Sequence, residues 1–431
     1  MAFVVKNLSK KGADMKTLFS CAILGICLAS TVNVNGVPPA FTQLHDSSFK
    51  SPTTQIFVQN TTCTGSINLV ARLESGAIEY YNGTAWQELH NSGWGSSITR
   101  MHVDWSTGAP IVLVGLSLGS VEYYVNGSWT EFHDASWKAP ITQMAVNWNS
   151  GDPHIVVALA TGAVEYYVGG SWTELKNTDW DAPVTQMSVD WSQTNPRVVA
   201  GLGSGAVEYY VGGTWIELHN SSFVSPVTQM SVDWSHGAPN VLMGLGSGAV
   251  EHFNGTSGTW TQLHDATWGC AVEKMSVHWS NAKFPSVVLG LSNSYNASSN
   301  VGSVEYYNGN MWKQLNSTSW NAPISNLAVN WVNGSPATIV VGLGLQWSTG
   351  QKWITGAPLA VESPTYVAIY TSSNNTWTTT ASETNPISAM GVTFCSSGWP
   401  SIVYGLGVNQ ANFYNFGGLG PDAYKLFWNG R

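Results

Sequence analysis

The sequence predicts an all-β protein, a β-propeller of four-stranded antiparallel blades, and three observations support this prediction. Charged residues make up only 10% of the 431 residues, whereas glycine (44), tryptophan (22) and tyrosine (16) are abundant. Such a mixture favours short strands and tight turns over helices. The 43% of hydrophobic residues suffices to bury a large core. Finally, one sequence unit recurs about every 43 residues, which indicates a repeat architecture.

The repeat is clearest in the segments 141–148, 184–191 and 227–234, which all have the pattern Ile/Val-Thr-Gln-Met-x-Val-Asn/Asp-Trp. Its terminal tryptophan recurs at intervals of 43 to 52 residues, at Trp105, Trp148, Trp191, Trp234, Trp279 and Trp331. Helical arrays are excluded because the segments between these markers alternate with the period of strands.

Each unit contains four predicted strands. In 230–234 apolar and polar residues alternate, and 240–244 is a short apolar strand. The segment 206–210 is a third strand that ends at the turn Gly212-Gly213, and 215–219 is the fourth. Four short strands in 40 to 45 residues are typical of a propeller blade.

Seven complete units are expected, and they begin near Thr53, Ile98, Ile141, Val184, Val227, Val272 and Ile324. Near the C-terminus, 387–394, 402–407 and 413–416 supply three further strands, and the N-terminal segment Phe41–His45 matches the fourth strand 260–264. The sequence therefore predicts eight blades, the last completed by the N-terminal strand. If a neighbouring molecule's N-terminus fills the gap instead, the same pairing makes a head-to-tail polymer.

Three domains are predicted: a signal peptide with an upstream extension over 1–36, a single propeller over 37–418, and an aromatic C-terminal tail over 419–431. Met15 opens a cationic start followed by a short apolar run and small residues, the pattern of a secretory signal peptide. The long interval after Trp331 indicates an insertion over 345–364. We expect a secreted, extracellular protein.

Export makes glycosylation and disulfide formation possible. Asn-x-Ser/Thr sequons lie at Asn60, Asn82, Asn126, Asn220, Asn254, Asn296, Asn316, Asn333 and Asn374. Cys63 and Cys395 each follow the first strand of their unit, and we expect them to form a disulfide across the ring closure. Cys270 would then be free or intermolecular.

Several function classes are excluded by composition and motifs. Without residues 1–36 the chain has 12 cationic and 24 anionic residues, which disfavours nucleic acid as a partner. No segment after the signal peptide is long and apolar enough to span a membrane. The histidines lack metal-ligand spacing, the Gly-Ser-Gly stretches precede strands instead of helices, and no Gly-x-Ser-x-Gly motif occurs. We expect no metal, no cofactor and no enzymatic activity.

Two sets of repeated side chains are candidate ligand-binding residues. The third strands carry one carboxylate in six units: Glu79, Glu122, Glu165, Glu208, Glu251 and Glu305. The segments between units carry aromatic residues: Trp94, Trp137, Trp180, Trp268 and Trp320, with Phe223 in the remaining unit. Partly buried carboxylates need partners, and Gln143, Gln186, Gln229 or tryptophan indoles could supply them in a purely structural hydrogen-bond cluster. Alternatively, carboxylates beside flat aromatic rings suit the hydroxyls and the apolar face of a sugar.

The repeats Gly-x-Val-Glu-Tyr-Tyr and x-Trp-Thr-Glu-Leu-His resemble those of β-propeller lectins, broadly the tectonin and fungal fucose-lectin type. Fucose lectins of this kind hold sugar with an arginine and a glutamate beside an aromatic residue. This sequence supplies the glutamate and the aromatic residue without a recurring arginine. The resemblance therefore implies glycan binding without implying fucose as the ligand.

Together these observations predict a secreted, N-glycosylated, non-enzymatic propeller that binds glycans or glycoproteins multivalently through pockets between its blades. The alternative is a structural subunit of an extracellular fibre or coat, which self-associates by strand donation between molecules.

Overall fold

The computed structural model describes residues 42–45, 49, 51–59, 67–148, 152–280, 284–292, 302–316, 320, 322–344, 367–379, 387–394, 400–406 and 426–428. The predicted signal peptide, the Cys63–Cys395 disulfide, the 345–364 insertion and the sequons at Asn60 and Asn296 lie outside these residues.

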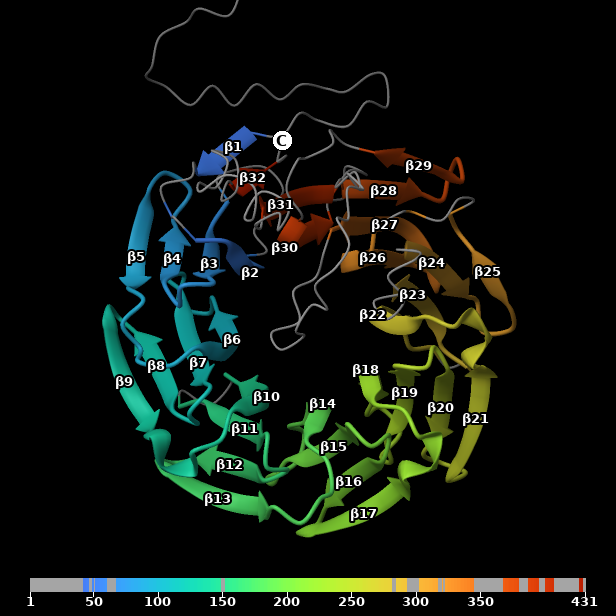
Figure 1. The fold of residues 1–431 in the computed structure, drawn as a ribbon, viewed down its shortest axis with the longest axis horizontal. Coiled ribbons are helices and arrows are strands. Elements are labelled where there is room, and N and C mark those ends of the chain that lie inside the picture. The colour runs from blue at the N-terminus through green and yellow to red at the C-terminus, as the bar shows by residue number, and fades with distance from the viewer. Residues whose placement is uncertain are drawn as a thin grey trace, which may run out of the picture.

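The described residues form a ring of four-stranded antiparallel sheets (Figure 1), which confirms the predicted all-β propeller architecture. Seven blades consist of four consecutive strands each. Blades 1 to 4 are β2 (Thr53–Val58), β3 (Leu69–Leu73), β4 (Ile78–Tyr81) and β5 (Trp86–His90); β6 (Ile98–Asp104), β7 (Ile111–Leu116), β8 (Val121–Val125) and β9 (Ser128–His133); β10 (Ile141–Asn147), β11 (His154–Leu159), β12 (Val164–Val168) and β13 (Ser171–Lys176); and β14 (Val184–Asp190), β15 (Arg197–Leu202), β16 (Val207–Val211) and β17 (Thr214–His219). Blades 5 to 7 are β18 (Val227–Asp233), β19 (Asn240–Leu245), β20 (Val250–Asn254) and β21 (Thr259–His264); β22 (Ala271–His278), β23 (Ser286–Ser292), β24 (Gly302–Tyr307) and β25 (Trp312–Gln314); and β26 (Ile324–Val332), β27 (Ser335–Leu343), β28 (Val367–Thr371) and β29 (Thr376–Thr379).

The predicted starts of the units are accurate. Six first strands begin at the expected residue, and the sixth unit begins at Ala271, one residue before the predicted Val272. In each blade the first strand lies innermost and the fourth outermost (Figure 1).

Because neighbouring strands are antiparallel, the connections alternate between the two edges of each blade. The first-to-second and third-to-fourth turns lie at one edge of the ring, which we call the turn edge. The second-to-third turns and the segments between blades lie at the opposite, linker edge. The two-residue turn Gly212-Gly213 has φ of 60° and 89°, a conformation that favours glycine and matches the twist of a tight hairpin.

Apolar side chains from neighbouring blades form the core, so that each seam between two blades is one hydrophobic cluster. At the seam between blades 5 and 6, the fully buried Leu242 and Val250 pack with Val272 and Leu289 of the next blade. The blades approach so closely that a methyl group at Gly244 would lie 2.5 Å from Cγ1 of Val272. Glycine in the second strand therefore permits this packing.

The remaining four-stranded sheet, which we call the composite sheet, draws on both ends of the chain. Its order is β1 (Thr42–His45), β32 (Leu426–Trp428), β31 (Pro400–Leu406) and β30 (Ile387–Phe394). It lies between blades 7 and 1 (Figure 1), and Ser388 Oγ donates a 2.6 Å hydrogen bond to the carbonyl of Thr53 in blade 1. The structure thus has seven complete blades instead of the eight predicted, and a composite sheet closes the ring.

Two further details of the C-terminal prediction need correction. The third strand of the composite sheet is Leu426–Trp428, not the predicted 413–416, which lies outside the described residues. Within the predicted tail 419–431, the three described residues form this strand and pair with β31 and with β1. The N-terminal strand does occupy the outermost position, as predicted. Within the described ranges, no helix is long and apolar enough to cross a membrane.

Candidate functional site

The seams between blades contain the predicted ligand-binding residues, and a tryptophan of each fourth strand anchors them. At seven seams this indole N–H donates to a backbone carbonyl in, or directly after, the fourth strand of the preceding sheet, at 2.8 to 3.1 Å. The pairs are Trp86 to Leu44, Trp129 to Leu89, Trp172 to Phe132, Trp215 to Leu175, Trp260 to Leu218, Trp312 to Leu263 and Trp377 to Leu315. The first of these pairs shows that β1 occupies the position of a fourth strand.

The aromatic residues between blades pack against these tryptophans. At each of the seven seams an edge-to-face contact joins the two rings, with centroids 4.7 to 5.7 Å apart. At five seams a histidine of the preceding fourth strand also stacks on the linker ring at 3.3 to 3.5 Å, for example His133 on Trp137. One face of the linker ring is therefore covered by imidazole at these seams.

Trp180, at the seam between blades 3 and 4, differs because Lys176 replaces the histidine. The Lys176 ammonium lies 5.2 Å from the centroid of the Trp180 ring and forms an ion pair with Asp179. Burial, followed by repulsion from Glu217, raises the pKa of the Glu208 carboxyl in the next blade, and the Lys176 ammonium partly opposes this rise. This seam thus combines an ammonium group, an indole and a carboxylate.

Each third-strand glutamate pairs in register with a residue of the fourth strand that the sequence analysis did not consider. In blades 1 to 4 this partner is a second glutamate: Glu79 with Glu88, Glu122 with Glu131, Glu165 with Glu174, and Glu208 with Glu217. In blades 5 and 6 it is a glutamine, Gln262 opposite Glu251 and Gln314 opposite Glu305. The two-residue turn of blade 4 fixes this register, so the glutamate pair could have been derived from the sequence.

Burial and like charge raise the pKa of these third-strand carboxyls. Glu165 is 8% exposed, and burial followed by repulsion from Glu174 raises its pKa to about 7. Burial raises the pKa of Glu305, which is 6% exposed, to about 7 as well. The pKa of Glu251 is raised mainly by burial, although its carboxylate accepts a 2.8 Å hydrogen bond from Gln262 Nε2.

The hydrogen-bond partners considered for these glutamates in a purely structural cluster serve other groups. Gln186 Nε2 donates to the carbonyl of Thr228, and Gln229 Nε2 to that of Glu273. Gln143 likewise donates to the carbonyl of Thr185. These amides join innermost strands of neighbouring blades, far from the third strands in sheet order, and the fourth-strand indoles bond carbonyls. The glutamine part of that interpretation is therefore wrong.

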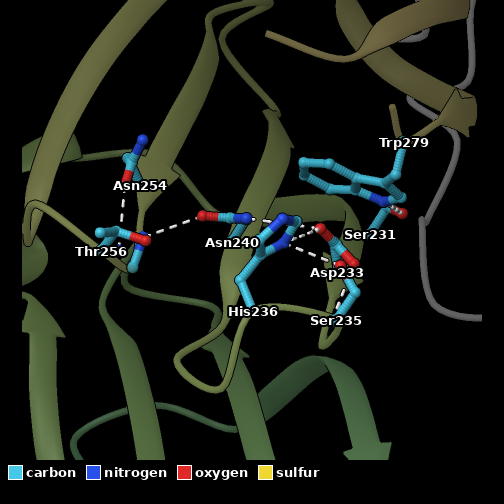
Figure 2. Close-up of polar contacts among 9 residues, drawn as sticks. Ser231, Asp233, Ser235, His236, Asn240, Asn254, Thr256 and Trp279 are labelled. Carbon is cyan, nitrogen blue, oxygen red and sulfur yellow. Dashed lines mark hydrogen bonds and ion pairs between the residues drawn. The ribbon is translucent and has the colours of Figure 1, made fainter. Parts of the chain in front are cut away.

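A polar network at the turn edge of blade 5 was also absent from the sequence analysis (Figure 2). Asp233 accepts from the backbone N–H of Ser235 at 3.0 Å and contacts His236 Nδ1 at 3.2 Å. Asn240 reaches from Asp233 to the next turn, where its Oδ1 accepts from the N–H of Gly255 at 3.0 Å. Burial acts to raise the Asp233 pKa, but these hydrogen bonds outweigh it and hold the pKa below its usual value. The network fixes two turns against each other.

The asparagines of the predicted sequons differ in their surroundings. Asn82, Asn126, Asn333 and Asn374 lie in turns at the turn edge, and Asn254 ends β20 directly before such a turn. Asn220 lies at the linker edge and is exposed. Asn316 is only 2% exposed, and its side chain accepts from the N–H of Val304 and donates to the carbonyl of Gly302. This burial argues against the predicted glycosylation of Asn316.

Two other predictions concern the thiol of Cys270 and the absence of a metal site. Cys270 is a partly buried free thiol, and burial raises its pKa. In the part of the chain that the structure describes, no group of three or more histidine, cysteine, aspartate or glutamate side chains could hold a metal ion.

Comparisons with known proteins identify no family. No family model matches the chain, and no curated protein matches it in sequence. Among solved structures, BBS1N in complex with ARL6DN is similar with a TM-score of 0.46 and 15% identity, over 71% of this chain and 92% of that chain. YCF48 bound to D1 peptide is similar with a TM-score of 0.47 and 12% identity, over 72% of this chain and 95% of that one. Likenesses this distant carry no argument about function.

Proposed function

We propose that this chain is a secreted, N-glycosylated β-propeller without enzymatic activity that binds carbohydrate at the seams between its blades. The observation that carries the proposal is the seam of Lys176, Trp180 and Glu208. There the Lys176 ammonium lies 5.2 Å from the centroid of the Trp180 indole and acts electrostatically on the Glu208 carboxyl of the next blade. These are the groups that hydrogen-bond sugar hydroxyls and pack on a sugar's apolar face.

Groups similar to Trp180 and Glu208 recur around the ring. Glutamates in six blades and linker aromatic rings at seven seams give a ring of similar positions, so that weak individual sites gain by avidity. Histidine replaces Lys176 at five seams, and its ring nitrogens supply the polar contact there.

The placement of the sequons supports glycosylation and leaves one edge accessible. Asn254 Oδ1 accepts from the N–H of Thr256 at 2.9 Å (Figure 2). It also accepts from the N–H of Ser257 at 3.1 Å. Asn82 does the same for Thr84 and Ala85. These contacts use the amide oxygen and leave Nδ2, the atom that carries an N-glycan. Apart from the buried Asn316, five of the six sequon asparagines in the described part of the chain lie at the turn edge, so the linker edge is the better surface for a ligand.

A glycan array tests this proposal with three variants. We expect Trp180→Ala and Glu208→Gln to reduce binding severalfold, because each removes one contact from the same seam. Ile216→Ala is the matched control, since Ile216 is 47% exposed and lies on the fourth strand of the same blade. The absence of binding by the unmodified protein, or equal binding by all variants, would contradict carbohydrate recognition at this seam.

A second candidate function, a subunit of an extracellular fibre or coat, is favoured by the composite sheet. Its outermost strand β1 has four residues and is held in the sheet by three residue pairs with β32. Unpaired edges recruit strands from other chains, and exchange of β1 between molecules would make a head-to-tail polymer. Analytical ultracentrifugation over a wide concentration range tests this: a strictly monomeric protein would exclude it.

A further inference from the structure

The innermost strands carry one polar residue at an equivalent position near the linker edge of every blade. This position is held by Gln55, Arg100, Gln143, Gln186, Gln229, Lys274 and Asn326. In blades 3 to 5 the residue is glutamine, and its neutral amide bonds a carbonyl of the next blade. Arg100 introduces a charge where these blades use an uncharged group.

A second arginine lies beside Arg100, at the seam between blades 1 and 2. Arg72 belongs to β3 and pairs in register with Gln55, to whose Oε1 its Nη1 donates at 3.0 Å. Its Nη2 crosses the seam and donates to the carbonyl of Ile98, two residues before Arg100. Its buried Nε has no hydrogen-bond partner in the described part of the chain.

Within the described ranges, neither of these arginines forms an ion pair with a carboxylate. Arg100 Nη1 donates at 2.9 Å to the carbonyl of its own neighbour Thr99. Burial followed by repulsion from Arg100 lowers the Arg72 pKa to about 10. Arg197 shows the contrast, because its Nη2 lies 2.6 Å from the carboxylate of Asp190.

Two neighbouring, partly buried guanidinium groups without a counter-ion repel each other and lose hydration. A bound oxyanion would relieve both costs, and a guanidinium edge matches the spacing of two oxygens in carboxylate, sulfate or phosphate. We propose that Arg72 and Arg100 form a binding site for an oxyanion group, a sulfate, phosphate or carboxylate. The site lies at the linker edge of the innermost strands between blades 1 and 2. Its arginines lie on a first and a second strand, whereas the proposed carbohydrate groups lie on third strands and in the segments between blades, so the oxyanion site does not depend on carbohydrate binding.

Thermal unfolding and calorimetric titration with sodium sulfate and sodium acetate test the proposal, with sodium chloride at matched ionic strength as the reference. We expect a saturable rise in Tm of a few degrees and measurable heat of binding for at least one oxyanion. Sulfate alone would indicate a tetrahedral ligand, and acetate alone a carboxylate. Either result supports the site, whereas no saturable effect of either anion would overturn it.

Arg100→Gln installs the residue of blades 3 to 5, and we expect it to weaken oxyanion affinity at least tenfold. Lys274→Gln is the matched control, because it removes a cation at the equivalent position of blade 6 and should leave the affinity unchanged. Arg100→Lys keeps the positive charge but cannot form the bidentate hydrogen bonds of a guanidinium, and we expect it to have an intermediate affinity. General salt effects act alike on the unmodified protein and its three variants. An equal saturable response of the unmodified protein and Arg100→Gln would therefore overturn the assignment.

Discussion

The seam between blades 5 and 6 and the seam between the composite sheet and blade 1 use the same contacts with different connectivity. In the first, Thr228 Oγ1 donates to the carbonyls of Gly244 and Val272 at 3.0 and 2.7 Å. In the second, Ser388 Oγ donates to those of Gly405 and Thr53 at 3.1 and 2.6 Å. The inner layers of the ring are therefore equivalent at both places.

The outer layers differ. In blade 5 a tight hairpin joins β20 to β21, and five residue pairs hold them in register. In the composite sheet β32 and β1 come from opposite ends of the chain and share three pairs. Because no hairpin connects β1 to β32, pairing them costs more conformational entropy than pairing two strands joined by a short turn. Ring closure therefore repeats the contacts of an ordinary seam but depends, in its outer half, on the two termini.

The largest expected effect comes from removing β1. In a chain that begins at residue 50, Trp86 loses the carbonyl of Leu44, and Leu44 no longer packs beside Val403. We expect the free energy of unfolding to fall by roughly 3–5 kcal/mol, measured by chemical denaturation. A peptide of residues 37–49 added in excess should restore stability. An unchanged midpoint would mean that β1 contributes nothing to closure.

Glycine substitution tests whether the inner layers are as tightly packed as at an ordinary seam. A methyl group at Gly405 would lie 2.7 Å from Cβ of Thr53, and one at Gly244 would lie 2.6 Å from Cβ of Val272. Gly405→Ala and Gly244→Ala should each destabilise the protein by roughly 1–3 kcal/mol. Gly203→Ala is the control, because its nearest contact would be an ordinary 3.6 Å. A harmless Gly405→Ala would show that the closing seam is looser.

The smallest expected effect is the pH dependence of stability. It compares Glu79, which lies beside the composite sheet, with Glu165, which lies at an ordinary seam between two blades. Tyr81 of blade 1 packs with the composite sheet, and Glu79 lies two residues earlier on the same face of β4. Burial followed by Glu88 raises the Glu79 pKa to about 7, as Glu174 does for Glu165. A raised folded pKa means that stability is highest below the unfolded value of 4.5 and falls as the pH rises to about 7.

Glu165→Gln should therefore have little effect at pH 4 and raise stability by roughly 1–2 kcal/mol at pH 8, where the native carboxylate is charged. Glu79→Gln should change the stability in the same direction but by a smaller amount, because Glu79 is more exposed than Glu165. Scanning calorimetry at both pH values measures the difference. Equal stabilisation at pH 4 and pH 8 would exclude carboxylate ionisation as the cause.

Much of the candidate site followed from the repeat, but the partners of its side chains did not. The positions of the third-strand glutamates and of six linker aromatic rings were predicted residue by residue, whereas the seventh ring, Phe49 before blade 1, was not. Their neighbours depend on how one blade rotates against the next. That rotation brings the Trp172 indole to the carbonyl of Phe132 and aims Gln186 at a backbone carbonyl of the next blade. The burial of Asn316 could not be read from its sequon for the same reason.

The sequence by itself determined the strands, their order within a blade and the starts of the units, because hydrophobic alternation and turn residues act over a few neighbouring positions. Only the tertiary structure decided that Leu426–Trp428 completes the composite sheet and that Arg72 and Arg100 meet at one seam. Both depend on contacts between residues distant in the chain, whose closeness is set by the packing of whole blades.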